Sequence, residues 1–209
     1  MNKCTRLLVV TVALICAIGC GRPTKVPVVS VGPSATADSL VYIADRAGTV
    51  RAIGRDGKEQ WSYKLAGDLS ENGVAPDLRI DSLAARSGGA LYVLATKITG
   101  PSAGTVELCG LNGNHMIWHR EAREAQPGIN PIAVDSGAIY LSGDNGTLFA
   151  YSRADGQLKW KFTVSQGALG SPLVSADGTI YVTGPGHNLH AISPDGVEEW
   201  KAETHEEGY

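Results

Sequence analysis

The chain has 209 residues, 43% of them hydrophobic, which is enough for one sizeable hydrophobic core or one array of repeats. Its formal net charge is −3, and this near balance argues against a nucleic-acid partner, which usually requires a basic face. The 26 glycines indicate a chain rich in tight turns.

The first segment, residues 1–19, is typical of a secretory signal peptide. Two basic residues, Lys3 and Arg6, precede an apolar run from Leu7 to Ile18. As a helix this run would cover only about 18 Å, which is short of the roughly 30 Å hydrocarbon core of a bilayer. The sequence therefore predicts a leader rather than a membrane-spanning helix.

Residues 17–20 read Ala-Ile-Gly-Cys and resemble a bacterial lipobox, in which small residues precede a cysteine that receives a lipid. Alanine at the first of these positions departs from the usual leucine. We expect lipidation of Cys20 and a lipidated tether over residues 20–27; an ordinary leader with an incidental cysteine is the alternative. Lipidation would leave Cys109 as the remaining cysteine of the mature chain, so no intrachain disulfide is expected.

A pattern repeats four times over residues 28–203. Each copy has a tryptophan four or five residues after the glycine of an Asp-Gly or Asn-Gly turn. The chain contains four tryptophans, so none falls outside the pattern: Trp61, Trp118, Trp160 and Trp200. Their spacings of 57, 42 and 40 residues indicate one repeat of propeller-blade length.

Upstream of each turn lies an apolar strand with a tyrosine near its centre, and the four copies contain Tyr42, Tyr92, Tyr140 and Tyr181. Side chains alternate between the faces of a strand, and both faces are apolar here, so each strand is covered on both sides. A more variable first strand is expected at 26–32, 75–81, 130–136 and 171–177. The prediction is an all-β propeller of four-stranded antiparallel blades, at about 28–66, 74–121, 129–164 and 170–203, with a tail at 204–209.

A strand that ends in small residues and is followed by Asp-Gly and a tryptophan resembles the tryptophan-docking repeat of pyrroloquinoline-quinone-type (PQQ-like) β-propellers. Residues 150–162 and 191–203 match it best. The resemblance implies that the tryptophans dock neighbouring blades. A lipobox before such repeats is similar to the non-enzymatic BamB-like lipoproteins of outer-membrane assembly. The quinoprotein dehydrogenases have about eight blades, calcium ligands and a vicinal cysteine pair, which this chain lacks.

The resemblance implies a lipid-anchored, non-catalytic scaffold on the periplasmic side of the outer membrane, without cofactor or metal. Its expected partners are envelope or outer-membrane proteins and the membrane itself, with no nucleic acid. The alternatives are a propeller that binds or converts a sugar or a quinone, and a fragment of a larger quinoprotein-like protein.

The middle turn of the second repeat is expanded over Thr96–Gly104. Binding residues often lie on loops of a rigid scaffold, so this turn is a candidate binding loop, with tolerated drift as the alternative. Its candidate residues are Thr96, Lys97, Ile98, Thr99, Gly100, Pro101 and Ser102. Cys109 is interpreted as a small buried hydrophobe in the column of Ile53, Tyr151 and Ile192.

Four repeats in phase leave three arrangements open. The chain is a fragment of a longer propeller, a compact four-bladed ring, or an open half that associates with a second copy. We expect an incomplete propeller, either a fragment or a half.

Overall fold

The computed structural model describes six segments of the chain: 34–45, 47–70, 72–100, 103–122, 131–164 and 167–203. Within them the strands form four antiparallel sheets of four strands each, which confirms the predicted all-β fold of four propeller blades. The predicted leader, Cys20, the tether and the tail at 204–209 lie outside the described residues.

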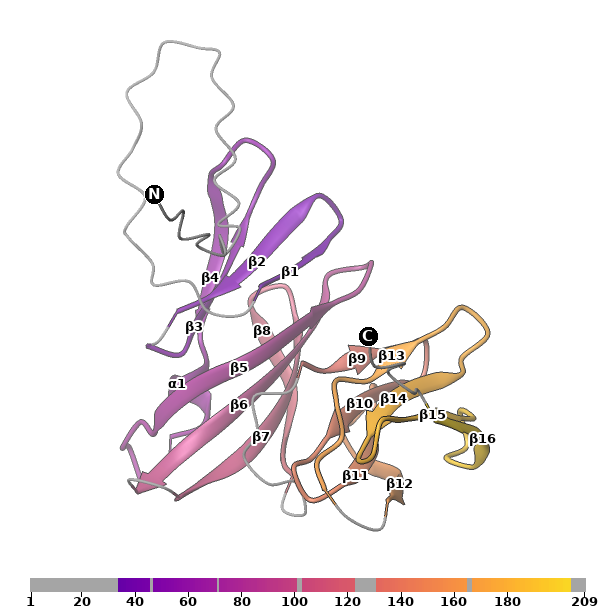
Figure 1. Cartoon of the computed structure of the whole chain (residues 1–209). Helices are drawn as coiled ribbons and strands as arrows, with labels where there is room; N and C mark the ends of the chain where they lie inside the picture. Colours follow the sequence, from indigo (N-terminus) through magenta and orange to yellow (C-terminus); the bar gives the residue numbers. More distant parts are fainter. Residues whose placement is uncertain are drawn as a thin grey trace, which may run out of the picture.

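The blades follow one another in chain order (Figure 1). Blade one contains β1 (Ser34–Ala37), β2 (Leu40–Ala44), β3 (Thr49–Ile53) and β4 (Glu59–Lys64), followed by α1 (Leu65–Asp68). Blade two contains β5 (Asp77–Ala85), β6 (Ala90–Gly100), β7 (Ala103–Asn112) and β8 (His115–Glu121). Blade three contains β9 (Ala133–Val134), β10 (Ala138–Ser142), β11 (Thr147–Ser152) and β12 (Leu158–Thr163). Blade four contains β13 (Leu173–Val174), β14 (Ile180–Gly184), β15 (Asn188–Ile192) and β16 (Glu198–Glu203).

One row of side chains recurs across the second, third and fourth strands of every blade. In blade one, Tyr42 lies opposite Ala52, and Ala52 lies opposite Trp61. The small central residue leaves room for the indole to lie over the third strand and reach the tyrosine. The Tyr–Trp ring centroids are 5.7, 6.3, 5.8 and 5.8 Å apart in the four blades. The other three rows are Tyr92–Gly110–Trp118, Tyr140–Ala150–Trp160 and Tyr181–Ala191–Trp200.

A β-bulge precedes the tryptophan in each blade, because the register between the third and fourth strands shifts beside the small residue. The extra residue of the fourth strand is Gln60, Ile117, Lys159 or Glu199. A bulge increases the local twist of its strand, which here gives all four blades the same twisted outer edge.

Three hydrophobic cores lie between the blades, one at each joint between successive sheets. The first includes Tyr42 from blade one and Leu91 from blade two, together with Leu65 of α1. The second joins blades two and three, and the third joins blades three and four. The facing sides of successive sheets are therefore buried against each other, which is how blades too thin to form their own cores become stable.

Cys109 lies in the first of these cores and is fully buried, as predicted for a small hydrophobe. Burial, and the nearby charge of Glu107, raise the pKa of its thiol. The predicted column was wrong by two residues, because Leu111, which pairs with Leu91, stands where Ile53 stands opposite Val41 in blade one. Gly110, not Cys109, pairs with both Tyr92 and Trp118, so Gly110 occupies the small central position of blade two.

The first strand of blade one differs from the prediction, because the partner of β2 is Ser34–Ala37 and not residues 26–32, which lie outside the described part of the chain. A two-residue turn at Asp38 and Ser39, both with positive φ, joins β1 to β2. The sequence holds a sign of this register. Pro33 stands nine residues before Tyr42, as Pro172 stands before Tyr181.

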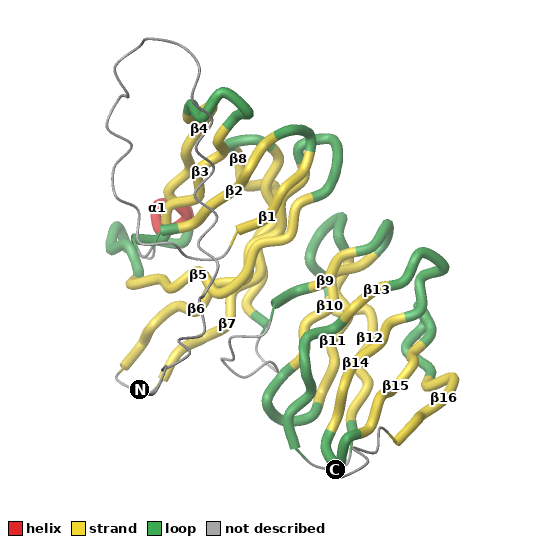
Figure 2. Tube along the Cα trace, turned by 45° about the horizontal axis from the view of Figure 1, so that its top comes forward, coloured by secondary structure: helices red, strands yellow, loops and turns green. Residues whose placement is uncertain are grey.

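The array is open, with blades one and four at its two ends (Figures 1 and 2). Val41 on the outer face of blade one is 43% exposed, whereas its counterparts Leu91, Ile139 and Ile180 are fully buried between blades. The structure therefore does not contain a closed four-bladed ring. In the described segments no helix is long and apolar enough to cross a membrane.

Candidate functional site

At two of the three joints between the described blades, a tryptophan of one blade forms a hydrogen bond with the next blade. The indole Nε1 of Trp118 donates a hydrogen bond to the carbonyl of Arg153, at 3.0 Å. The indole of Trp160 donates in the same way to the carbonyl of Pro194, at 2.8 Å. In both cases the acceptor belongs to the turn between the third and fourth strands of the next blade. It lies two or three residues before the glycine of that blade's Asp-Gly turn.

A glycine in each turn makes room for the indole. A Cβ built on Gly156 would lie 2.6 Å from the ring of Trp118, and one on Gly196 would lie 2.6 Å from the ring of Trp160. Both glycines also have positive φ, of 71° and 86°, where other residues are strained. The Asp-Gly signature thus serves both the turn and the contact with the preceding blade.

Arg153 makes a second set of contacts at the joint between blades two and three. Its Nε donates to the hydroxyl of Tyr92 at 2.8 Å, and its guanidinium carbon lies 5.4 Å from the centre of the same ring. Its Nη1 donates to the carbonyls of Asp135 and Ser136, at 2.9 and 2.8 Å. The sequence analysis missed this residue. The signal that marks it is an arginine shortly before the Asp-Gly of blade three, as at Arg55 in blade one.

The other two tryptophans have different surroundings. Trp61 packs beside the first core, but a Cβ built on Gly113 of the next blade would meet nothing within 4 Å. The reason is the shorter turn of blade two, in which Asn112 pairs directly with His115 across a two-residue turn. Trp200 is 44% exposed, and blade four is the last blade in the described part of the chain.

The candidate binding loop of blade two is an extended hairpin rather than an expanded turn. β6 continues through Gly100, where Lys97 pairs with Thr105, and Ile98 pairs with both Gly104 and Asp77 of β5. The three strands lengthen together and project beyond the other blades (Figure 1). The turn prediction was therefore wrong for this segment. Pro101 and Ser102 lie outside the described residues.

Thr96 is buried, which sets it apart from the exposed Ile98 and Thr99 at the hairpin tip. Its hydroxyl donates to Asp81 at 2.6 Å, and Asp81 also forms an ion pair with Arg79 at 2.5 Å. Asp81 is the extra residue of a bulge in β5, which explains why its carboxylate turns inward. These contacts fix the base of the hairpin, whereas Ile98 and Thr99 near its tip remain exposed.

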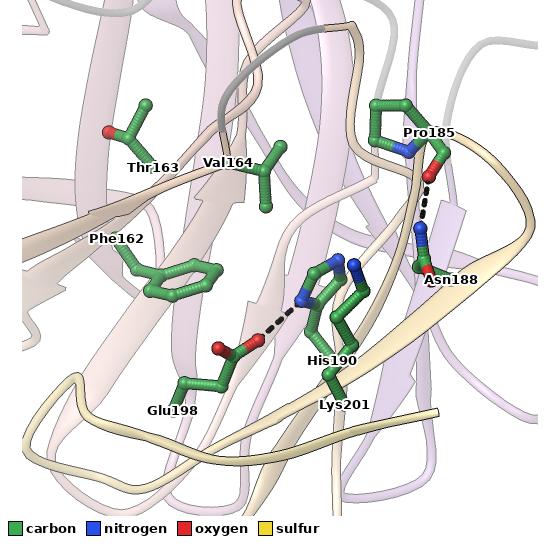
Figure 3. A pocket seen from close by; sticks show the side chains of 8 residues that line it. All are labelled: Phe162, Thr163, Val164, Pro185, Asn188, His190, Glu198 and Lys201. Atoms are coloured by element: carbon green, nitrogen blue, oxygen red, sulfur yellow. Dashed lines mark hydrogen bonds and ion pairs between the residues drawn. The ribbon is translucent and has the colours of Figure 1, made fainter. Parts of the chain in front are cut away.

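A pocket of about 230 Å³ lies between blades three and four (Figure 3). The buried imidazole of His190 forms a 2.6 Å contact with Glu198, and its centre lies 5.9 Å from that of the Phe162 ring, with the two planes tilted by 59°. Lys201 lines the same wall. The pocket is smaller than the roughly 300–1,000 Å³ usual for ligand sites.

The sequence contains two closely spaced pairs of histidines, His115 with His119 and His187 with His190. Among the described residues no three His, Cys, Asp or Glu side chains are placed to hold one metal ion. What the geometry offers is a rigid array with interlocked joints and one projecting hairpin.

Asp135 shapes the β9–β10 turn next to the third core. Its Oδ1 accepts hydrogen bonds from the backbone N–H groups of Gly137 and Ala138, both at 2.6 Å, and its Oδ2 accepts from the Tyr140 hydroxyl at 2.7 Å. Burial acts to raise the pKa of Asp135, but these hydrogen bonds outweigh it, and the pKa lies below its usual value. The folded state therefore favours the ionised form of the Asp135 carboxyl.

Acidification should therefore destabilise the fold through Asp135. A carboxyl whose pKa is lower in the folded state contributes stability above its unfolded pKa of about 3.9, and this is lost as the pH falls toward the folded pKa. We expect Asp135→Asn to lower the urea midpoint at about pH 6 and to show a smaller further loss at about pH 3 than the unmodified chain. An equal loss of stability between these two pH values in both proteins would contradict this role. Asp144→Asn, at an exposed position, is the matched control.

Comparisons with known proteins agree with the propeller fold described above. A family model described as outer membrane protein assembly factor BamB matches residues 102–209, just over half of the chain. The serine/threonine-protein kinase AfsK of Streptomyces griseus is 29% identical over 158 residues, which are 73% of this chain and 18% of the kinase.

Two solved structures share the fold. BamB from Moraxella catarrhalis superposes with a TM-score of 0.59 at 15% identity, covering 84% of this chain and 48% of that one. The quinohemoprotein alcohol dehydrogenase of Comamonas testosteroni gives a TM-score of 0.57 at 18% identity, covering 84% and 35%. The chain spans less than half the length of each of these three proteins. At these identities the superpositions show a common propeller architecture.

Proposed function

Because the chain belongs to the family of outer membrane protein assembly factor BamB, whose blades are PQQ-like repeats, we propose that it is a non-catalytic scaffold that binds proteins of the cell envelope. The observation that carries the proposal is the blade-two hairpin, a rigid element that projects from an otherwise compact array. Outer-membrane protein assembly is the most specific form of the role. Fold alone does not define a function, so the hairpin supplies the argument.

The hairpin suits a protein partner better than a small molecule. Its tip carries the exposed Ile98 and Thr99 on strands that are already paired, so binding costs little ordering of the backbone. Val74, three residues before β5, is 71% exposed and adds an apolar side chain just before the strand that pairs with the hairpin. These apolar side chains lie on or beside the element that projects from the array, where a protein partner would reach them.

Photo-cross-linking in envelopes tests the proposal. A photoreactive amino acid in place of Thr99 should capture an envelope protein, because this residue is exposed at the hairpin tip. The matched control is Asn114, which is also exposed but lies in the turn at the opposite end of blade two. Equal capture from both positions, or none from Thr99, would refute a binding role for the hairpin.

The lipid anchor is a separate part of the proposal, and its support is the lipobox-like sequence that ends at Cys20. We expect Cys20→Ala to abolish labelling by a fatty-acid probe and to release the chain from the membrane fraction. Cys109→Ala is the control, since its buried thiol cannot be the acyl acceptor in the folded protein. Undiminished labelling of the Cys20→Ala chain would exclude lipidation at that residue.

A further inference from the structure

The sequence contains three Asn-Gly pairs, and the structure places them in different surroundings. In such a pair the backbone nitrogen of the glycine can attack the side-chain amide carbon of the asparagine, because glycine has no Cβ to shield that nitrogen. Asparagine is one of the thermolabile residues of proteins. Whether a pair reacts in the folded protein depends on the contacts that hold its glycine N–H and its amide. The pairs are Asn72-Gly73, Asn112-Gly113 and Asn145-Gly146.

Hydrogen bonds hold the second and third pairs. The N–H of Gly113 donates to the carbonyl of Gly89 at 3.2 Å. The N–H of Gly146 donates to the carbonyl of Gly143 at 3.2 Å, and Gly146 is buried. The Oδ1 of Asn145 also accepts a hydrogen bond from a backbone N–H, at 3.2 Å. In both pairs an attack by the glycine nitrogen would first have to break its hydrogen bond, which slows the reaction.

The first pair is exposed and lies in a turn between α1 and β5. Asn72 and Gly73 have positive φ, of 52° and 77°, and a Cβ built on Gly73 would meet nothing within 4 Å. Among the described residues, neither the N–H of Gly73 nor the side chain of Asn72 has a hydrogen-bond partner. The attacking nitrogen and the amide carbon are therefore both open to reaction.

We propose that Asn72 is a site of spontaneous deamidation in the folded protein. Hydroxide takes the proton of the Gly73 N–H, and the nitrogen forms a bond to Cγ of Asn72. The bond from Cγ to the side-chain nitrogen then breaks, and that nitrogen takes a proton from water and leaves as ammonia. Water opens the resulting succinimide ring at either carbonyl, which gives aspartate or isoaspartate. No oxidant or reductant takes part.

The reaction changes the link between blades one and two. Both products carry a new negative charge two residues before the exposed Val74, and isoaspartate also lengthens the backbone by one carbon. The deamidation itself needs no partner, so the inference stands independently of the scaffold role.

Peptide mapping by mass spectrometry of the folded full chain, incubated at mildly alkaline pH, tests the proposal. Asn72 should convert faster than Asn112 and Asn145 by at least about fivefold, the factor that corresponds to one net hydrogen bond. The rate at Asn72 should rise with pH, because hydroxide starts the reaction. Both aspartate and isoaspartate should form at this position, because the route passes through the succinimide.

Two controls define the result. In urea, where the fold no longer holds any of the glycine N–H groups, the three pairs should convert at similar rates. Asn72→Gln should remove the acidic product from its peptide, because glutamine would have to close a larger ring. Equal conversion of the three pairs in the folded chain, aspartate without isoaspartate, or an advantage of Asn72 that persists unchanged in urea would each overturn the proposal.

Discussion

Replacing Trp118 with alanine should lower the free energy of unfolding by about 3–5 kcal/mol, the usual range for large aromatic truncations in cores. The residue is 8% exposed, belongs to the core between blades two and three, and donates to the Arg153 carbonyl. Its loss leaves both a cavity and an unpaired acceptor. Urea denaturation with an unchanged slope measures the effect and guards against a shift in the unfolded state.

Trp200→Ala is the matched control, because the same residue type stands in the same row of the last described blade. With 44% of its surface exposed, it should cost less than about 2 kcal/mol. Trp160, docked on Pro194 but half-buried, should fall between the two. Equal losses at all three positions would contradict the docking account.

Gly156→Ala should destabilise the chain by about 2–5 kcal/mol. Part of this, about 1–2 kcal/mol, comes from placing a side chain at φ +71°. The rest, roughly 1–3 kcal/mol, comes from forcing a methyl group into the ring of Trp118, which a built Cβ would approach to 2.6 Å. Thermal or urea unfolding of the variant measures the sum.

Gly113→Ala separates the two contributions. Gly113 also has positive φ, of 57°, but a built Cβ there meets nothing within 4 Å. It should therefore show only the backbone cost of about 1–2 kcal/mol. In a Trp118→Ala background most of the excess cost of Gly156→Ala should disappear, because only the contact with the flexible Arg120 side chain, at 2.9 Å, then remains. An excess that is undiminished in that background would show that the indole is not its cause.

The repeat was readable from the sequence because each blade needs the same few residues in the same places. The tyrosine, the small residue and the tryptophan form one cross-strand row, and the glycine of the turn needs positive φ. Such local requirements leave a periodic pattern that survives differences elsewhere. The blade number and the strand order follow from it.

Three features were decided by tertiary structure alone. The blade-two insertion extends the strands because β5 and β7 both offer pairing partners to residues such as Ile98, whereas composition alone had indicated a loop. Arg153 gains its role from Tyr92, which is 61 residues distant and belongs to another blade. The unequal surroundings of Trp61, Trp118 and Trp200 depend on which blade lies next to each and on the length of its turn. The periodic pattern reflects the contacts that each blade makes within itself. These three features instead depend on contacts between strands or blades that residues distant in the sequence form.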